Sequence, residues 1–347
     1  MKLSPARLEP VFVPRIWGAR SLAPLFAGKA ALAEPIGEVW LTGNESTFAT
    51  GPFAGRKLGE AWREMTPDWA GTRVRRDAPF PLLVKFLFPE QKLSIQVHPG
   101  DDYAQRHEGG EFGKTEMWYA VAARAGAEVM VGLKARVTPE SFRQALANGT
   151  VEECLEHLAV RAGEAIFVPA GTAHTIGPGL VLCEIQEHSD ITYRVFDYNR
   201  LTAEGKPRQL HIEQALEVIN FSEQSGGKLE PVRLTRGAVT ETYFIACRYF
   251  ATEKWEFAER IAAVTRADHF DLLITLAGSG RIEFGDAAVD YAPAQVWLLP
   301  AALGAYQLAP ESPTALLRTY VPDVNDFVRR LADRRVDESA WSRLVYP

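Results

Sequence analysis

The sequence predicts a mainly β protein, built from antiparallel barrels or sandwiches with a few short helices. Short runs rich in Val, Ile, Phe, Leu and Tyr recur along the chain and are punctuated by Gly and Pro, which is typical of strands joined by turns. Helical patterns are few, and many short strands with turns between them favour antiparallel over parallel sheets. At 347 residues, the chain suits two domains.

Strands dominate the first two thirds of the chain. The apolar and β-branched runs predict strands over Pro81–Phe88, Lys92–Val97, Glu116–Ala122, Glu128–Gly132, Ala165–Val168, Val181–Gln186 and Thr192–Tyr198.

Helices are expected in four places. The first has Thr138 as N-cap and Pro139 at its first position, and Asn148-Gly149 ends it. The others are predicted over Val151–Leu158, Ile212–Asn220 and Val324–Leu331.

A polar, Gly-rich segment, Ser222–Lys228, predicts a linker. We therefore expect one domain over residues 1–221, with a helical insertion at about 138–158, and a second over 229–347. Strands of the second domain are predicted over Tyr243–Thr252, Asp271–Leu276, Gly280–Phe284 and Ala294–Leu299.

A faint internal repeat links the two halves. The segment Ala165–His174 is similar to Gln295–Ala305 when the two are aligned on Pro169 and Pro300. His174 then falls opposite Ala305, so the second half is expected to repeat the scaffold without the polar site.

Composition excludes several functions. The net charge of −6 is spread along the chain, without the basic stripe of a nucleic-acid binder. No apolar run reaches the length of a membrane span, and the first residues lack the apolar core of a secretion signal. Cys154, Cys183 and Cys247 have no metal-binding spacing and are expected to be buried free thiols, which fits a reducing cytoplasm.

Three short segments concentrate candidate metal ligands. In the first, Ser94, Gln96 and His98 share one face of a strand, because side chains alternate. In the second, Lys114 and Glu116 share a face, for which a solvated ion pair is the simpler interpretation.

The third segment runs from Gly163 to His174. Pro169 ends a buried strand, Gly171 permits a tight reversal and His174 enters the next strand. A lone histidine there is more often a satisfied core residue. Two histidines, a glutamate and a glutamine converging in one barrel, however, form a set typical of catalytic zinc.

These segments resemble known families. Gly163–His174 is similar to the second motif of the cupin superfamily, with Pro178 where Asn is usual. Gln96–Pro99, Lys114–Tyr119 and Thr192–Tyr198 resemble the hallmarks of type I mannose-6-phosphate isomerases in their short bacterial form. The similarity covers roughly residues 8–220, and one departure is Trp17-Gly18-Ala19 in place of Trp-Gly-Gly.

The resemblance implies two cupin-type jelly-roll barrels, the second degenerate and without a metal site. It implies one Zn²⁺ per chain and the interconversion of mannose 6-phosphate and fructose 6-phosphate. Matched position by position, Gln96, His98, Glu116 and His174 correspond to metal ligands, with Gln96 the least secure. Arg194 corresponds to the catalytic arginine.

Isomerisation through an enediol(ate) needs further groups. Arg194 is expected to stabilise the enediolate, unless it only pairs with Asp190 or Asp197. Glu184 is a candidate base or substrate contact, against a plain buried ion pair, and Lys114 is a candidate for orienting a sugar hydroxyl. Phosphate donors are open among Ser94, Lys114, Lys85 and Arg200.

Two other functions remain open on the sequence. One is a cupin that binds a sugar phosphate without catalysis, as a regulator would. The other is a metal-dependent cupin oxygenase with iron at a two-His-one-carboxylate site. An isomerase acting on another hexose 6-phosphate is also compatible with these residues, and the oligomeric state is undetermined.

Overall fold

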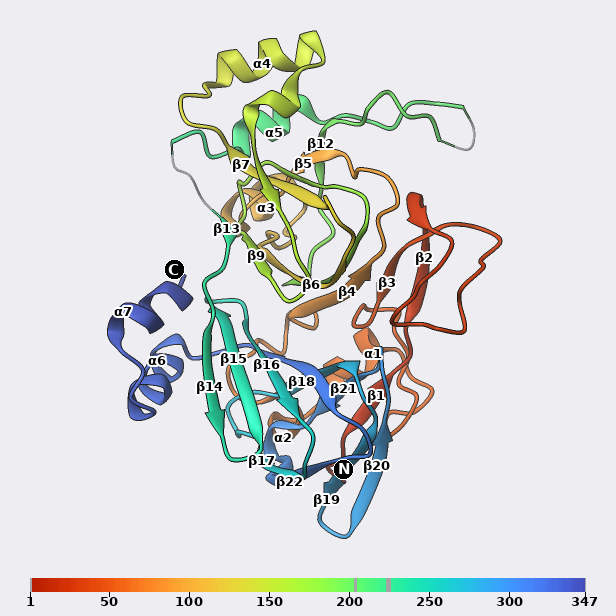
Figure 1. Cartoon of the computed structure of the whole chain (residues 1–347), viewed down its shortest axis with the longest axis vertical. Coiled ribbons are helices and arrows are strands. Elements are labelled where there is room, and N and C mark those ends of the chain that lie inside the picture. The colour runs from red at the N-terminus through yellow and green to blue at the C-terminus, as the bar shows by residue number, and fades with distance from the viewer. Residues whose placement is uncertain (1, 203–204, 223–225, 347) are drawn as a thin grey trace.

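The computed structural model describes residues 2–202, 205–222 and 226–346. The chain forms two β-rich halves that lie one above the other in Figure 1. The mainly β prediction is confirmed. Among the described residues, no helix has both the length and the apolar character needed to cross a membrane.

The first half contains a seven-stranded and a five-stranded antiparallel sheet. The larger has the order β13-β9-β6-β11-β4-β3-β2 and the smaller the order β12-β5-β10-β7-β8. Their bounds are β2 Val11–Ala19, β3 Ile36–Trp40, β4 Leu82–Leu87, β5 Ile95–Val97, β6 Glu116–Ala123, β7 Glu128–Leu133, β8 Leu155–Ala159, β9 Ala165–Val168, β10 His174–Ile176, β11 Leu180–Glu187, β12 Tyr193–Phe196 and β13 Gly227–Lys228.

The second half repeats this arrangement. Its larger sheet has the order β1-β21-β18-β23-β16-β15-β14 and its smaller one the order β17-β22-β19-β20. The bounds are β1 Ala6–Leu8, β14 Val232–Arg236, β15 Val239–Ala246, β16 Ala251–Phe257, β17 Ile261–Val264, β18 Asp271–Ala277, β19 Gly280–Phe284, β20 Ala287–Tyr291, β21 Val296–Leu299, β22 Ala305–Pro310 and β23 Thr314–Tyr320.

The two orders correspond strand for strand except that β12 has no counterpart in the described second half, so the predicted repeat is confirmed. Strand β21 takes the place of β9, and β22 takes the place of β10. His174 begins β10 and Ala305 begins β22. The two residues therefore hold equivalent positions, as the alignment on Pro169 and Pro300 predicts.

Each face of the larger sheet in the first half has a different environment. Met117, Cys183 and Ile185 point into a core that also contains Phe244 and Leu272 of the second half. The next residues along the same strands point the other way, into the first barrel. The two halves thus bury the outer faces of their large sheets against each other, which leaves each barrel interior free to hold polar groups.

The two halves also exchange short segments. Strand β1 pairs with β21 in the second half, and β13 pairs with β9 in the first. Residues 223–225 of the predicted linker lie outside the described residues, but Gly227–Lys228 are a strand rather than linker. The division into residues 1–221 and 229–347 stays a prediction, and the pairing of β1 with β21 crosses it.

The helix with the Thr138 cap is confirmed. It is α4, Pro139–Asn148, where the Thr138 hydroxyl accepts from the Ser141 N–H and Gly149 ends the helix at φ 73°. The other helices are α1 Leu58–Glu64, α2 Pro67–Ala70, α3 Asp101–His107, α5 Ile212–Val218, α6 Val324–Asp333 and α7 Glu338–Trp341, with 3₁₀ turns over Val151–Cys154, Ala301–Leu303 and Ser342–Leu344.

Two sequence predictions are wrong. Val151–Leu158 is not a helix, because only Val151–Cys154 form a 3₁₀ turn before β8 pairs with the edge of the smaller sheet. Tyr243–Thr252 is not one strand, because the chain reverses at Cys247–Phe250 between β15 and β16. The three cysteines are buried and free, as expected.

Candidate metal centre and active site

Three strands of the first barrel bring three ligand-type side chains together. His98 follows β5, Glu116 begins β6 and His174 begins β10. One ligand atom from each lies within 4.8 Å of the others, and all three residues are buried. The Glu116 carboxylate oxygens lie 3.7 Å from Nε2 of His98 and 3.5 Å from Nε2 of His174.

The local sequence positions these ligands. Gly171 has φ 83°, a conformation that an L side chain adopts only under strain. It lets the chain reverse between Pro169 and His174, and its N–H donates to the His98 carbonyl at 2.8 Å. The turn thereby links the two histidines through the backbone.

Both histidines have a defined tautomer. Nδ1 of His98 lies 2.7 Å from the Ile191 carbonyl, and Nδ1 of His174 lies 2.8 Å from the Thr172 carbonyl. A carbonyl only accepts, so Nδ1 carries the proton and each Nε2 is an unprotonated acceptor. Nε2 of His98 lies 3.2 Å from Nζ of Lys114, and Nε2 of His174 lies 3.3 Å from the Gln96 amide nitrogen. Burial lowers the pKa of His174 to about 4 and, with the Lys114 charge, lowers the pKa of His98 as well. Neutral imidazoles of this kind are metal ligands.

The Glu116 carboxylate has unused hydrogen-bonding capacity. Its Oε2 is buried and makes no hydrogen bond among the described residues, although the Lys114 ammonium lies 3.0 Å away. Two imidazole lone pairs and a carboxylate facing one point fit a divalent cation. Lys114 and Glu116 are 4% and 1% exposed, so the simpler interpretation as a solvated ion pair is wrong.

Gln96 lies at the edge of the cluster. Its side-chain amide nitrogen is 3.3 Å from Nε2 of His174, and its oxygen accepts from Ser94 Oγ at 3.1 Å. Exchanging the amide oxygen and nitrogen would turn an acceptor toward the cluster. Gln96 is therefore placed where it could supply a fourth ligand atom.

A cavity of about 510 Å³ opens beside the cluster. Of the candidate site residues from the sequence, six line it: Lys85, Ser94, Gln96, Lys114, Glu184 and Arg194. Its volume is in the range of cavities that hold small organic ligands.

Glu184 lies on the cavity wall, and the pKa of its carboxyl is raised. Its Oε1 accepts from the Trp118 indole N–H at 3.2 Å, and Oε2 is 3.6 Å from Nζ of Lys85. Burial raises the pKa of Glu184 to about 7, although the charge of Lys114 opposes this. Lys85 is thus the ion-pair partner of Glu184.

Arg194 faces the cavity without a carboxylate partner among the described residues. Its Nε donates to Ser94 Oγ at 3.2 Å and its Nη1 donates to the Gln209 carbonyl at 3.0 Å. Asp197, the alternative partner, instead pairs with Arg200 and Arg208. A purely structural ion pair for Arg194 is therefore absent from the described structure.

Two further ion pairs lie on the cavity wall. Arg15 pairs with Glu38 at 2.9 Å, and Asp190 pairs with Lys85 at 3.0 Å. Arg15 and Glu38 lie on the neighbouring strands β2 and β3, whereas Asp190 lies in the loop after β11 and Lys85 on β4. The remaining charged or titratable groups on the wall are Arg208 and His211.

Two of the four candidate phosphate donors already pair with groups of the protein. Lys85 is 2% exposed and lies between Glu184 and Asp190. Arg200 bonds to Asp197 and to the Lys92 carbonyl and is not on the cavity wall.

The fold and the site together define a double-barrel cupin: two jelly rolls, with a two-His-one-Glu cluster and added Lys and Arg in the first. The family model "Phosphomannose isomerase type I, catalytic domain" matches residues 6–126. The chain is 36% identical over 308 residues to the probable mannose-6-phosphate isomerase GmuF of Bacillus subtilis, covering 88% of this chain and 96% of the relative. It belongs to the type I mannose-6-phosphate isomerase family.

Other relatives agree. The mannose-6-phosphate isomerase ManA of B. subtilis is 35% identical over 315 residues, 89% of this chain and 96% of ManA. A crystal structure of the B. subtilis mannose 6-phosphate isomerase superposes with a TM-score of 0.83 at 31% identity, covering 91% of this chain and 99% of that one. Phosphomannose isomerase from Salmonella typhimurium, at 18% identity and a TM-score of 0.71, shares the fold.

Proposed function

We propose that the chain interconverts mannose 6-phosphate and fructose 6-phosphate, using one Zn²⁺ held by His98, Glu116 and His174, with Gln96 as a fourth ligand. The observation that carries the proposal is the convergence of these three buried side chains beside a cavity of about 510 Å³. Family membership supports the same reaction, because the relatives are named for it.

The chemical difficulty is the weak acidity of the C2 proton. A bound zinc ion would supply Lewis-acid polarisation of a sugar oxygen. The chain's own residues supply the rest. Arg194 carries a permanent positive charge and, since no described carboxylate neutralises it, that charge is available to the developing enediolate.

Lys114 and Ser94 position the substrate in this proposal. Burial alone would lower the pKa of Lys114, but Glu116 and Glu184 outweigh it and raise the pKa, so the ammonium stays charged. It can donate to a sugar hydroxyl near the cluster. The Ser94 hydroxyl lies between Gln96 and Arg194 and can donate or accept at the same wall.

Glu184 is the proposed base that carries the proton between C2 and C1. A pKa of about 7 lets one carboxyl accept the proton from C2 and return it to C1 near neutral pH. Lys85 and the Trp118 indole hold the carboxyl in place from the side of the sheet. No observation on the described residues favours the regulator or the oxygenase.

The deciding experiment is a coupled assay with mannose 6-phosphate before and after chelation. We expect activity to disappear with the chelator and return with zinc, and metal analysis to find about one zinc per active chain. Oxygen uptake with iron in the same sample would support an oxygenase, and metal with sugar-phosphate binding but no turnover would support a regulator.

The cytoplasm is the proposed location, consistent with three buried free thiols.

A further inference from the structure

The second half contains a cavity of about 460 Å³ in the position that corresponds to the proposed active site. Ala305 and Val264 line it and pair with each other, as His174 and Gln96 pair in the first half. Because the strand orders also correspond, the cavity lies inside the repeated barrel. The second half thus has both the strand arrangement of the first barrel and a cavity inside it.

The strand registers identify what replaced each metal ligand. Glu116 pairs with the last residue of β9, and Asp271 pairs with the last residue of β21. Counting along the same registers, the equivalents are Val264 for Gln96, Arg266 for His98, Asp271 for Glu116 and Ala305 for His174. Only the carboxylate remains, so the second cavity is not a metal site.

Both halves have a buried ion pair at equivalent positions, but the strands that carry the positive and the negative residue are exchanged. Lys85 and Glu184 pair across β4 and β11, and Glu253 and Arg318 pair across β16 and β23 at the equivalent positions. Arg318 Nη1 lies 2.5 Å from Glu253, and its Nη2 lies 2.8 Å from Asp271. A guanidinium therefore compensates the carboxylate that a metal would compensate in the first half.

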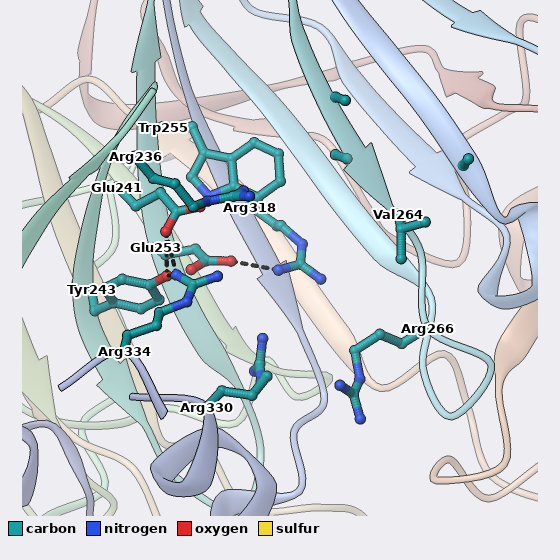
Figure 2. A pocket seen from close by; sticks show the side chains of 13 residues that line it. Arg236, Glu241, Tyr243, Glu253, Trp255, Val264, Arg266, Arg318, Arg330 and Arg334 are labelled. Carbon is teal, nitrogen blue, oxygen red and sulfur yellow. Dashed lines mark hydrogen bonds and ion pairs between the residues drawn. The ribbon is translucent and has the colours of Figure 1, made fainter. Parts of the chain in front are cut away.

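Arginine dominates the wall of this second cavity. Five arginines and two glutamates line it, and helix α6 with its C-cap contributes two of the arginines. Figure 2 shows Arg330 rising from α6 toward the strands that carry Glu253 and Arg318, with Arg266 on the opposite side. The arginines are Arg236, Arg266, Arg318, Arg330 and Arg334.

Several donors on this wall have no acceptor among the described residues. The indole N–H of Trp255 and Nε of Arg318 are buried without a hydrogen bond, on residues that are 7% and 5% exposed. Arg334 bonds to Glu241 and Tyr243 through Nη1 alone. Asp326 contacts Arg266 and Arg330 from outside the cavity wall. Buried donors without partners are uncommon in native proteins and indicate a missing acceptor.

We propose that this second cavity binds a phosphorylated monosaccharide, at a site separate from the proposed active site. Arg266, Arg330 and Arg334 would hold the phosphate, because guanidinium groups donate in pairs to phosphate oxygens. The carboxylates of Glu241 and Glu253 only accept, so they suit sugar hydroxyls rather than the anion. The Trp255 indole N–H would donate to a ring or hydroxyl oxygen.

The test follows the Trp255 indole signal in ¹H–¹⁵N NMR spectra of the full chain, assigned by its loss in Trp255→Phe. Adding glucose 6-phosphate should shift this signal and saturate. In Arg330→Gln/Arg334→Gln the apparent affinity should fall at least about tenfold, since two donors to the phosphate are lost. The matched control is Arg329→Gln on the same helix, whose side chain is 71% exposed and off the cavity wall, and its affinity should stay within about twofold.

Three outcomes would overturn the proposal. These are no shift of the Trp255 signal at millimolar glucose 6-phosphate, the same affinity in the double variant and the control, or the same shift and affinity with inorganic phosphate alone. The last result would indicate an anion site that does not recognise the sugar. Because this signal reports the second half only, its behaviour is independent of whether the isomerase assay succeeds.

Discussion

The Arg194 guanidinium is the clearest single-residue target in the first cavity. It is held by Ser94 and the Gln209 carbonyl, and no described carboxylate neutralises its charge. Arg194→Ala should lower kcat by about 10²–10³, because one preorganised donor to the enediolate is lost. Metal content should be unchanged. Arg143→Ala, an exposed arginine paired with Glu213, is the control, and a variant that keeps its metal and most of its kcat would refute the catalytic role.

The pKa of Glu184 sets an expected pH dependence. A base must be deprotonated to act, so kcat/KM should rise with pH through about 7, the raised pKa of this carboxyl. Glu184→Gln should lower the rate and remove this limb. Glu187→Gln is a matched control on the same strand, since Glu187 is buried but accepts from the Thr115 N–H away from the cavity. If the acidic limb persists in Glu184→Gln, another group is the base.

Some residues of the site could be predicted from the sequence, and others could not. His98 and His174 belong to motifs whose Pro or Gly shapes the turn beside them, and the family resemblance predicts that they converge with Glu116. Arg15 on β2 and Asp190 in the loop after β11 reach the cavity through the tertiary fold, where they pair with Glu38 and Lys85. The ion pair of Glu184 with Lys85 likewise depends on the neighbouring strand, which a single sequence does not identify.

At the scale of elements, the turn before β10 controls the site. A Cβ on Gly171 would lie 2.9 Å from the Val218 carbonyl, in addition to its strained φ of 83°. Gly163, with φ 89°, has open space around its Cβ position. Gly163→Ala should cost about 1 kcal/mol from backbone strain, and Gly171→Ala about 1–3 kcal/mol.

Calorimetry and metal analysis separate the two variants. Gly171→Ala should also lose zinc affinity, since the turn connects His98 with His174. Equal stability losses with equal zinc content in both variants would show that the close contact with Val218 is unimportant.

A helix or strand whose start and end residues are marked in the sequence can be predicted. One that forms because it pairs with a distant segment cannot. Helix α4 has its N-cap, N1 proline and terminal glycine in the sequence. The segment over 151–158 has helical composition, but short helices are marginal and pairing of β8 with β7 prevails. The turn at Cys247–Phe250 lacks Gly and Pro, so the break between β15 and β16 carries no local signal.

For the whole molecule, the contact between the two halves should determine stability. Phe244 of the second half is 1% exposed, and its ring lies 5.5 Å from that of Tyr119. Phe244→Ala should lower the free energy of unfolding by about 3–5 kcal/mol through lost burial and a cavity.

Both halves should melt together, with isomerase activity lost in the same transition. Leu201→Ala, at a 56% exposed residue, should have little effect. Two separate calorimetric transitions, with activity following only one, would contradict a shared core.

The mainly β class, the duplication and the absence of metal ligands in the second half follow from patterns along the chain. The face-to-face packing of the two large sheets could not be predicted in this way. Strands that are apolar on both faces can pack equally well against several other sheets or helices.

Strand β1 has a consequence for the order of assembly. Ala6–Leu8 complete a sheet whose neighbouring strand, β21, is almost 290 residues further along. A ribosome therefore releases this edge of the second barrel first and its partner near the end of synthesis. Until then the earliest segment must wait unpaired, so the second barrel closes late, after all strands of the first barrel, β2–β13, have been synthesised.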